Sequence, residues 1–409
     1  MRSIATVALV VACGGADAGG HWGGAVETLP GGEVRVTNPS RGLWEDGRPW
    51  RLVPTLVLGE EDGPVATVFG AISGLEVDAA GRIYVLDRQA NELRIFTPDG
   101  AHVRSVGRAG DGPGEYRNAN GLRWLTPDTL VVVDQRANRY TILDAEGDYV
   151  RTVPRGLGFY GWVLFGGVNA GRLYERFTLG PEGEEQLALF GTLLHERVGR
   201  LATDRAPAGG ADVPAEPVRD TVPLPSMAGP LYEAFSVQTS RGGMSMSVPF
   251  AAGPVFHLDG RGGIWHGHGS AFRILHTSLA GDTIAEILLA AEPTPVTSAE
   301  LAEWEAGKSV EQFKQMGGRL DLDRIPKSKP FFDGLYVDPD RYLWVSVPAG
   351  ATEVAFRIFD PDGRYLGWLR AAGLKGDAYV PMVVRGGRLH MVGRDELDVQ
   401  RVYVFQIER

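Results

Sequence analysis

The sequence contains a single cysteine, Cys13, among 409 residues. One cysteine cannot form an internal disulfide framework, and it excludes any metal site built from several thiolates. No apolar run reaches the roughly 18 residues that a membrane-spanning helix needs. Basic residues are outnumbered by acidic ones. The chain has 41 Lys and Arg and 51 Asp and Glu, which gives a net charge of −10. Since nucleic-acid binding requires a basic surface that neutralises phosphates, we expect no nucleic-acid partner.

Sequence signatures of catalysis are missing as well. The chain has no Gly-x-Ser-x-Gly segment for a serine nucleophile and no His-Glu-x-x-His helix for zinc. The segment 110–115 is rich in glycine, but no Lys-Ser/Thr pair closes it, so it is not a phosphate-binding loop. Two alternatives stay open: His266 and His268 share a face of a strand and would begin a metal site, and Glu115 would bind a ligand. We assign no catalytic residue, no metal and no cofactor from the sequence.

The N-terminus has the layout of a bacterial export signal. A short basic start is followed by an apolar run that ends at Ala12, directly before Cys13. This arrangement resembles the lipobox of bacterial lipoproteins, in which the cysteine is lipidated and becomes the mature N-terminus. The alternative is an ordinary signal peptide with an incidental cysteine. Gly14 follows where an Asp would be expected to retain the protein at the inner membrane, so the outer membrane is preferred.

These features predict how the N-terminal region is organised. Residues 1–12 are the signal peptide, and residues 13–50 form a glycine-rich, flexible tether that buries too little apolar surface to fold. The protein is therefore expected to be extracytoplasmic, with contact to the membrane through its lipid anchor only.

The most informative pattern that is present is one short strand in six copies. Successive copies start 47, 47, 85, 84 and 46 residues apart. Near-constant spacing of this size is typical of stacked four-stranded units and indicates a β-propeller. The copies begin at Leu93, Tyr140, Leu187, Phe272, Phe356 and Val402.

The repeat predicts an all-β fold, a six-bladed β-propeller of four-stranded blades over residues 51–409. Two spacings exceed the period and indicate insertions at about 204–241 and 295–330. The first is rich in Pro and Gly, with an extra hairpin near Gly242. The second opens with a Thr297–Glu300 capping box, which predicts one inserted helix that runs to about Met316.

The end of the chain leaves the sixth blade without its outer strand. The segment Leu52–Leu58 precedes the first blade and has strand character. We expect it to fill the outer place of the sixth blade, since pairing there would remove an open sheet edge that invites aggregation.

Several motifs resemble those of the bacterial six-bladed β-propeller lipoproteins related to NHL repeats. The matching segments are Gly81–Asp87, Ile95–Gly100 and Gly107–Tyr116, of which the last is the most specific. The resemblance extends from about residue 50 to the end. It implies the fold more firmly than the function, because most members of that family have no established activity.

Alignment of the inner strands brings one residue from each blade to an equivalent place. These residues are Glu76, Arg123, Gly166, His257, Tyr336 and Met382. Equivalent residues of a propeller surround its axis, so the polar members Glu76, Arg123, His257 and Tyr336 are predicted to line one mouth of the central channel. Such a mixture suits a small polar or anionic ligand. In the alternative, this register packs between blades or its polar groups pair internally.

The sequence favours a surface-tethered binding or interaction module of the bacterial envelope, whose partner is a small polar ligand or an envelope protein. One alternative is an extracytoplasmic, metal-dependent propeller enzyme similar to lactonases or peptide-amide lyases. Another is a structural component of an envelope complex, with the inserted helix as its docking element.

Overall fold

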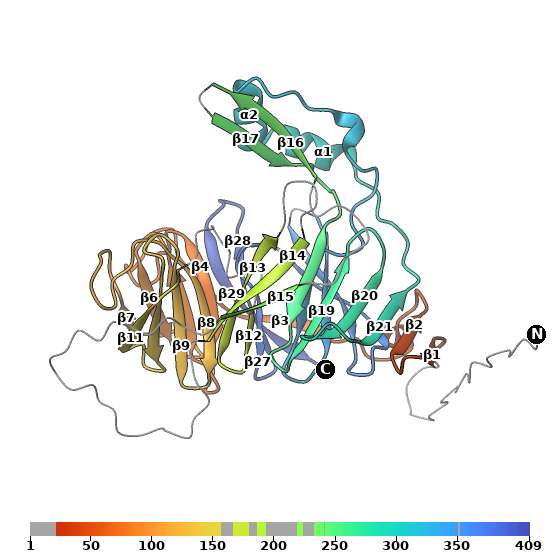
Figure 1. Cartoon of the computed structure of the whole chain (residues 1–409), viewed down its shortest axis with the longest axis horizontal. Coiled ribbons are helices and arrows are strands. Elements are labelled where there is room, and N and C mark those ends of the chain that lie inside the picture. Colours follow the sequence, from red (N-terminus) through yellow and green to blue (C-terminus); the bar gives the residue numbers. More distant parts are fainter. Residues whose placement is uncertain are drawn as a thin grey trace, which may run out of the picture.

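The computed structural model describes residues 22–156, 167–179, 186–193, 219–223, 233–240, 242–350 and 352–409. Within these residues the chain forms six sheets of four or more strands, which stand side by side in one body (Figure 1). Each sheet contains four strands that pair in antiparallel order. The prediction of an all-β, six-bladed β-propeller is confirmed.

The first three blades follow the chain from strand to strand. Blade 1 consists of β4 (Ile72–Val77), β5 (Ile83–Asp87), β6 (Glu92–Phe96) and β7 (His102–Val106). Blade 2 consists of β8 (Ala119–Thr126), β9 (Thr129–Asp134), β10 (Arg139–Asp144) and β11 (Tyr149–Pro154). Blade 3 consists of β12 (Gly167–Asn169), β13 (Arg172–Leu179), β14 (Gln186–Leu193) and β15 (Arg219–Pro223).

The last three blades repeat this plan with additions. Blade 4 consists of β18 (Pro254–Leu258), β19 (Gly263–His268), β20 (Arg273–Ser278) and β21 (Thr283–Leu289). Blade 5 consists of β22 (Gly334–Val337), β23 (Leu343–Val347), β24 (Glu353–Phe359) and β25 (Tyr365–Ala372). Blade 6 consists of β26 (Lys375–Gly376) and β27 (Val383–Arg385), both paired with β28 (Arg388–Arg394), then β29 (Gln400–Glu408) and β3 (Arg51–Leu58).

The hydrophobic core lies between neighbouring blades. Every residue of β5 is buried, as expected for a strand with both faces covered. One face packs with β8 and β9 of blade 2 in a cluster that includes Tyr84 and Leu122. The other face packs with blade 6 in a cluster that includes Val85 and Val404. Each large apolar side chain buried in this way contributes roughly 1.5–3 kcal/mol, so the contacts between blades hold the propeller together.

The outer strand of blade 6 comes from the segment before blade 1. β3 pairs in antiparallel order with β29, with Leu56 opposite Val404 and Val57 opposite Tyr403. The predicted place of Leu52–Leu58 is confirmed, and the edge of β29 is covered by a paired strand.

The flexible tether predicted for residues 13–50 is wrong for its second half. β1 (Ala25–Thr28) and β2 (Val34–Asn38) form a hairpin, and β2 pairs in parallel with β21 at the outer edge of blade 4. The 3-10 helix η1 (Leu43–Asp46) follows. Residues 1–21, and with them the predicted signal peptide and Cys13, lie outside the described residues.

Buried contacts explain why this segment is folded. Asn38 is only 1% exposed, and its amide donates hydrogen bonds to the carbonyl oxygens of Leu288 and Gly363. Its side-chain oxygen accepts from the Tyr365 backbone N–H at 2.7 Å. Trp50 packs into the core between blades 5 and 6. These partners lie about 250 residues or more along the chain, so composition alone did not reveal them.

Two insertions that are distant in sequence pack together into a small cap above the propeller (Figure 1). The hairpin of β16 (Ala234–Thr239) and β17 (Gly242–Ser247) precedes blade 4, whereas α1 (Ser298–Glu305) and α2 (Lys308–Gln315) precede blade 5. Their shared core contains Phe235 and Met246 from the hairpin and Val310 and Phe313 from α2. Below, "the cap" means β16, β17, α1 and α2.

The structure corrects the prediction of one inserted helix. The Thr297 capping box is present, but the helical stretch divides at Gly307, which is the N-cap of α2. Glycine is a poor former of helix interiors because ordering its backbone costs the most entropy, so the chain turns there. The 3-10 helix η3 (Leu322–Arg324) completes the insertion predicted for 295–330.

The insertion predicted for 204–241 has a wrong boundary. It includes β15, which is the outer strand of blade 3. The extra hairpin predicted near Gly242 is present as β16 and β17. Residues 194–218 and 224–232 lie outside the described residues.

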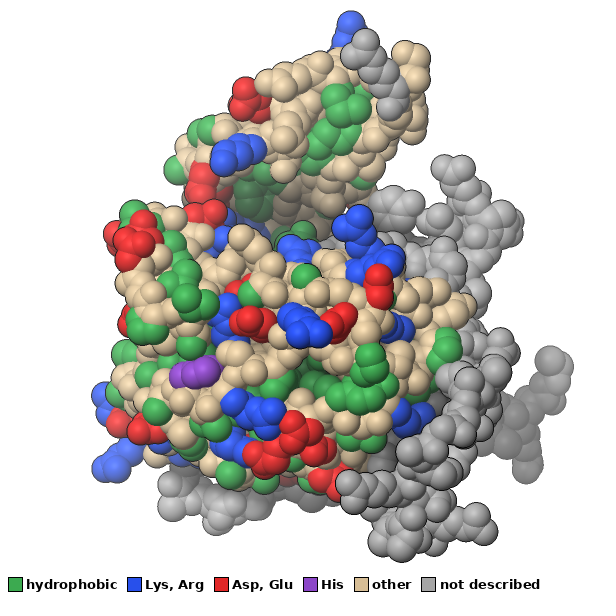
Figure 2. All heavy atoms as spheres, turned by 90° about the vertical axis from the view of Figure 1, so that its left-hand side faces the viewer, with side chains coloured by type: hydrophobic (Ala, Val, Ile, Leu, Met, Phe, Trp, Pro, Cys, Tyr) green, Lys and Arg blue, Asp and Glu red, His purple; other side chains and the backbone are tan. Residues whose placement is uncertain are grey.

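Polar groups in the turns between strands serve the scaffold. The Asp338 carboxylate accepts from the Tyr342 backbone N–H at 2.8 Å and from the Trp344 indole N–H at 3.1 Å. Figure 2 shows the face over the first two blades, where basic and acidic side chains are interspersed and form no large patch of one sign. In the part of the chain that the structure describes, no helix is long and apolar enough to cross a bilayer.

Candidate functional site

A cavity of about 1510 Å³ lies at the centre of the propeller. The first strands of all six blades contribute to its lining, through residues of β4, β8, β12, β18, β22 and β27. The cap covers one end, where Met246, Trp304 and Lys308 join the lining. The cavity therefore lies where a propeller presents repeat-equivalent residues to one another, and the cap adds a wall that the repeat does not supply.

The structure brings the four predicted ring residues into this one cavity. Glu76 comes from β4, Arg123 from β8, His257 from β18 and Tyr336 from β22, and all four line it. Of the other two aligned residues, Met382 lines the cavity, whereas Gly166 lies outside the described residues. We call Glu76, Arg123, His257 and Tyr336 the axial ring.

Glu76 and Arg123 form the charged half of the axial ring. Their nearest side-chain atoms, Glu76 Oε1 and Arg123 Nη1, are 3.4 Å apart, and Arg123 also donates to its neighbour's carbonyl oxygen at 2.9 Å. Burial raises the pKa of the Glu76 carboxyl to about 7, although the positive charge of Arg123 opposes the rise. The distance between the two charged groups is thus long for an ion pair. Desolvation raises the pKa of the Glu76 carboxyl by more than the charge of Arg123 lowers it.

A second guanidinium, which the repeat alignment missed, approaches the same carboxyl. Arg385 is the last residue of β27, lines the cavity, and lowers the pKa of Glu76 by its charge. It makes no ion pair with any carboxylate in the described part of the chain. Its position three residues after Met382, in the inner strand of blade 6, is the only signal in the sequence that marks it.

His257 and Tyr336 form the uncharged half of the axial ring. Their ring centroids lie 5.2 Å apart with the planes tilted by 55°. Burial lowers the pKa of His257 to about 4 and raises that of Tyr336 to about 12, so both are neutral at pH 7. The Tyr336 hydroxyl accepts a hydrogen bond from the Val384 backbone N–H at 3.1 Å, which leaves its own proton available as a donor.

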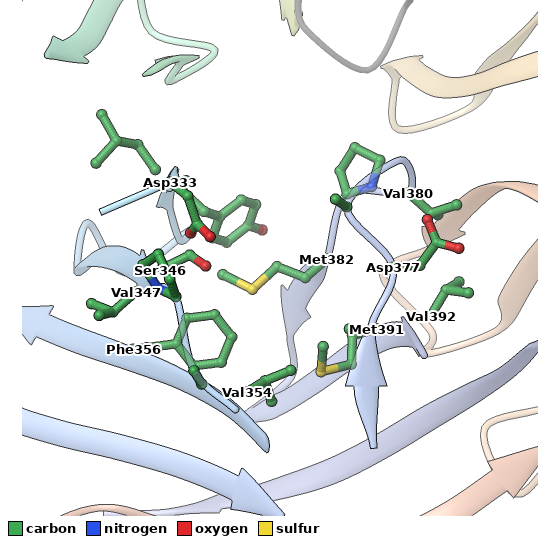
Figure 3. Close-up of a pocket in the computed structure, with 18 of the residues that line it drawn as sticks. Asp333, Ser346, Val347, Val354, Phe356, Asp377, Val380, Met382, Met391 and Val392 are labelled. Carbon is green, nitrogen blue, oxygen red and sulfur yellow. The ribbon is translucent and has the colours of Figure 1, made fainter. Parts of the chain in front are cut away.

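The wall between blades 5 and 6 is mainly apolar. Figure 3 shows Phe356, Met382 and Met391 along this wall, with the Met382 side chain extending between Ser346 and Met391. Val354 and Val392 extend the same surface. Methionine side chains are flexible and polarizable, so this wall is suited to an apolar group whose shape varies.

The sequence-based metal candidates lie elsewhere. His266 is a core residue with 1% of its surface exposed, and His268 forms a hydrogen bond between its Nδ1 and the Ser270 hydroxyl at 2.8 Å. Glu115 accepts from the Gly112 backbone N–H and pairs with Arg108, as a loop-forming residue does. Among the described residues, no group of three or more His, Cys, Asp or Glu side chains is placed to hold a metal ion.

Comparisons with known proteins agree with this architecture. The model of the DUF5128 family, described as a 6-bladed beta-propeller, matches residues 66–154. No curated protein sequence matches the chain.

Several solved structures are similar to the chain. A member of the DUF4221 family from Bacteroides vulgatus is 12% identical, with 88% of this chain and 98% of that chain covered and a TM-score of 0.44. Virginiamycin B lyase from Staphylococcus aureus is 12% identical, with 88% and 100% covered and a TM-score of 0.41. Regucalcin from Agrobacterium tumefaciens is 11% identical, with 91% and 96% covered and a TM-score of 0.37. The chain is a six-bladed β-propeller that resembles the DUF5128 family over its first two blades.

Proposed function

We propose that this protein is an extracytoplasmic ligand-binding β-propeller that takes up a small anionic molecule in its axial cavity. The observation that supports it is the arrangement of two guanidinium groups, Arg123 and Arg385, around one carboxyl, Glu76. The two arginines keep their charge under all physiological conditions, whereas Glu76 loses part of its charge near pH 7. Two guanidinium groups therefore stand against one carboxyl at this level, although acidic side chains predominate in the lining of the cavity as a whole.

A carboxylate ligand would meet suitable partners at the axial ring. Arginine binds carboxylates through two parallel N–H donors, and such charge-assisted bonds are about twice as strong as neutral ones. The Tyr336 hydroxyl adds a third donor at the same level. His257 is held neutral, so it adds hydrogen bonding without a further charge. The apolar wall of blades 5 and 6 would then cover the rest of the ligand.

Attachment to the bacterial envelope through Cys13 belongs to the same proposal. It is supported by the basic start, the apolar run and the single cysteine of the N-terminus. The Cys13→Ser variant is expected to lose a radioactive fatty-acid label that the unaltered protein incorporates. Label that persists on the variant would overturn the anchor but not the ligand site. Lasting attachment requires two or more acyl chains, since one holds only marginally.

Binding of matched pairs of small ligands tests the axial site. Calorimetry at pH 7 would compare small monocarboxylates with their amides, which have the same shape but no charge. We expect binding of the carboxylates, weakened at least about 10-fold by Arg123→Gln and by Arg385→Gln, since one charge-assisted bond is worth about 1.5–3 kcal/mol.

The matched control is Arg104→Gln, which removes an exposed arginine that pairs with Asp148 on the outside of the propeller. It should leave binding unchanged. Amides that bind as tightly as carboxylates, or arginine variants that bind like the unaltered protein, would contradict the proposal. The two alternatives, a metal-dependent enzyme and a structural envelope component, stay hypotheses of the sequence.

A further inference from the structure

An acidic side chain stands at the opposite, cap-side end of the cavity from the arginines. Asp333 directly precedes β22, at the point where the segment returning from the cap enters blade 5. Its carboxylate points toward the interior of the pocket in Figure 3. It has no Lys, Arg or His partner within the 4.0 Å of an ion pair in the described residues. Solvent reaches this carboxylate within the cavity.

Three other acidic residues that line the cavity have partners. Glu353 pairs with Arg370 at 3.0 Å, and Glu300 pairs with Lys329. Asp377 accepts from the Gln400 amide at 2.6 Å. Asp333 differs, because desolvation raises its pKa although the Ser346 hydroxyl and its own backbone N–H donate hydrogen bonds to it. A carboxylate without a cationic partner gains stability from a cation that enters the cavity.

The position of Asp333 relative to Tyr336 gives the separation of the two charged ends along the strand direction. Asp333 and Tyr336 are three residues apart along β22, and a strand rises about 3.3 Å per residue, so their levels differ by about 10 Å. Arg385 lies at the Tyr336 end, since its neighbour Val384 donates to the Tyr336 hydroxyl. The cavity thus presents an acceptor for a cation and donors for an anion, separated by about 10 Å or more along the direction of β22.

Part of the lining of the same cavity is apolar. It includes the side chains of Phe356, Met382 and Met391 (Figure 3). An extended peptide spans at most about 3.3–3.6 Å per residue. About three residues therefore cover a separation of about 10 Å. The volume of about 1510 Å³ leaves room for side chains of several sizes.

We propose that the ligand is a linear peptide of about three residues, with its free carboxylate at Arg123 and Arg385 and its free amino group at Asp333. The inference rests on the proposed function, because it uses the same anion site. Asp333 is in this proposal the residue that selects a free amino terminus. An apolar side chain of the peptide packs on Met382 and Met391, and the cap above limits the length of the chain that fits.

The test uses the purified full chain and peptides of one sequence with altered ends. Calorimetry would compare Ala-Leu-Ala with its N-acetylated form, its C-terminal amide, and the dipeptide and pentapeptide relatives. We expect the unblocked tripeptide to bind at least about 10-fold more tightly than either blocked form. We also expect it to bind more tightly than the shorter and longer peptides.

Variants at Asp333 separate the two ends of the peptide. Asp333→Asn should abolish the preference for the free amine and keep the preference for the free carboxylate. Asp333→Glu keeps the charge and should keep both, which guards against a loss of fold. Glu311→Gln, which alters an exposed acid of the cap outside the lining of the cavity, is the matched control and should leave both preferences unchanged.

The outcomes distinguish this inference from the proposed function. If the N-acetylated peptide binds as tightly as the free one while amidation still weakens binding, the amino-terminal site is wrong and the anion site survives. If small carboxylates bind but no peptide does, the peptide inference is overturned. If neither carboxylates nor peptides bind, the proposed function itself fails.

Discussion

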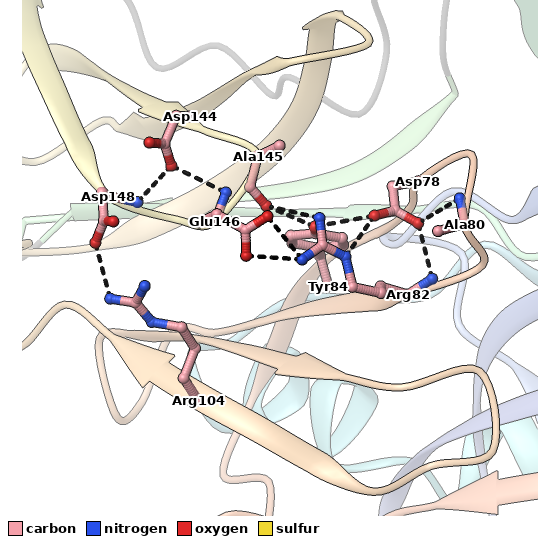
Figure 4. Close-up of polar contacts among 9 residues, drawn as sticks. All are labelled: Asp78, Ala80, Arg82, Tyr84, Arg104, Asp144, Ala145, Glu146 and Asp148. Atoms are coloured by element: carbon pink, nitrogen blue, oxygen red, sulfur yellow. Dashed lines mark hydrogen bonds and ion pairs between the residues drawn. The ribbon is translucent and has the colours of Figure 1, made fainter.

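Two carboxylates that are two residues apart, Glu76 at the end of β4 and Asp78 in the following turn, occupy opposite kinds of environment. Asp78 accepts from the backbone N–H groups of Ala80 and Arg82 at 2.9 and 2.8 Å, and from the Arg82 Nε at 2.6 Å (Figure 4). Burial opposes its ionisation, but the hydrogen bonds from Arg82 outweigh burial and lower its pKa. Burial of Glu76 is not compensated in this way, and its pKa rises to about 7.

The comparison separates the repeating scaffold from the cavity. Around Asp78 the polar groups link two blades, since Arg82 reaches Glu146 at 2.8 Å and Tyr84 donates to the Ala145 carbonyl oxygen at 2.7 Å (Figure 4). Around Glu76 the nearest guanidinium is 3.4 Å away, and the two arginines Arg123 and Arg385 act on this one carboxyl. Carboxylates whose desolvation is left uncompensated are concentrated at functional sites, so the difference between these neighbours is evidence for a site on the axis.

We expect the largest effect from removing β3, the strand that precedes blade 1 in the sequence but completes blade 6. Deletion of residues 14–60 takes away β3, exposes the edge of β29 and opens the core shared by blades 6 and 1. We expect no cooperative thermal unfolding transition. Deletion of residues 14–45 removes β1, β2 and the buried Asn38 but keeps β3 and should give a folded protein with a lowered melting temperature. Equal melting temperatures of the two truncations would show that β3 contributes nothing.

The next effect concerns the turn carboxylate. Asp78→Ala leaves the Arg82 guanidinium and the turn N–H groups without their acceptor, and should lower the free energy of unfolding by about 3 kcal/mol. Urea unfolding at pH 7 measures it. The control is Glu146→Ala, because Glu146 is the exposed end of the same network and should cost less than about 1 kcal/mol. A similar loss of unfolding free energy in both variants would mean that burial does not strengthen the interactions of Asp78.

The contribution of Glu76 to stability should depend on pH in the opposite sense to that of Asp78. Because its pKa is raised in the folded state, the folded protein binds the proton more tightly, and stability falls as pH rises from about 4.5 through about 7. The shift corresponds to about 3 kcal/mol at most. Glu76→Gln removes this loss, so its advantage in melting temperature over the unaltered protein should grow between pH 5 and pH 8. Asp78, with its lowered pKa, stabilises above pH 4 and loses that contribution in acid.

If the difference between the Glu76→Gln variant and the unaltered protein does not change with pH, Glu76 is paired as firmly as Asp78. The contrast between the two carboxylates would then disappear. Repeating the melting measurements at high salt serves as a control. The difference due to Glu76 should persist there, because a buried group is screened much less than surface charges.

The smallest expected effect lies on the surface. Arg104 and Asp148 are 2.8 Å apart, with both side chains substantially exposed. Figure 4 draws this pair beside the network around Asp78. Arg104→Gln should change the free energy of unfolding by less than about 0.5 kcal/mol, because solvent screens such pairs. A loss comparable to that of Asp78→Ala would show that distance alone, without burial, decides the strength of these ion pairs.

The period of the repeat predicted more of the cavity lining than any motif did. Glu76, Arg123, His257 and Tyr336 were found because repeat-equivalent residues face the same axis, and all four line one cavity. Asp333 and Arg385 were missed because they occupy places that no other blade marks as special. Their importance depends on what faces them across the cavity, which a position in a repeat does not encode.

What the sequence by itself determined was local and periodic. It established the six blades, the turns with their aspartates, the helix start at Thr297 and the strand that completes blade 6. The tertiary structure alone decided the contacts between distant segments: β2 added to blade 4, and two separate insertions joined as a cap over the cavity. Strand periodicity and turn residues are properties of neighbours along the chain, whereas desolvation, charge balance and cavity shape arise only when segments far apart in sequence enclose the same space.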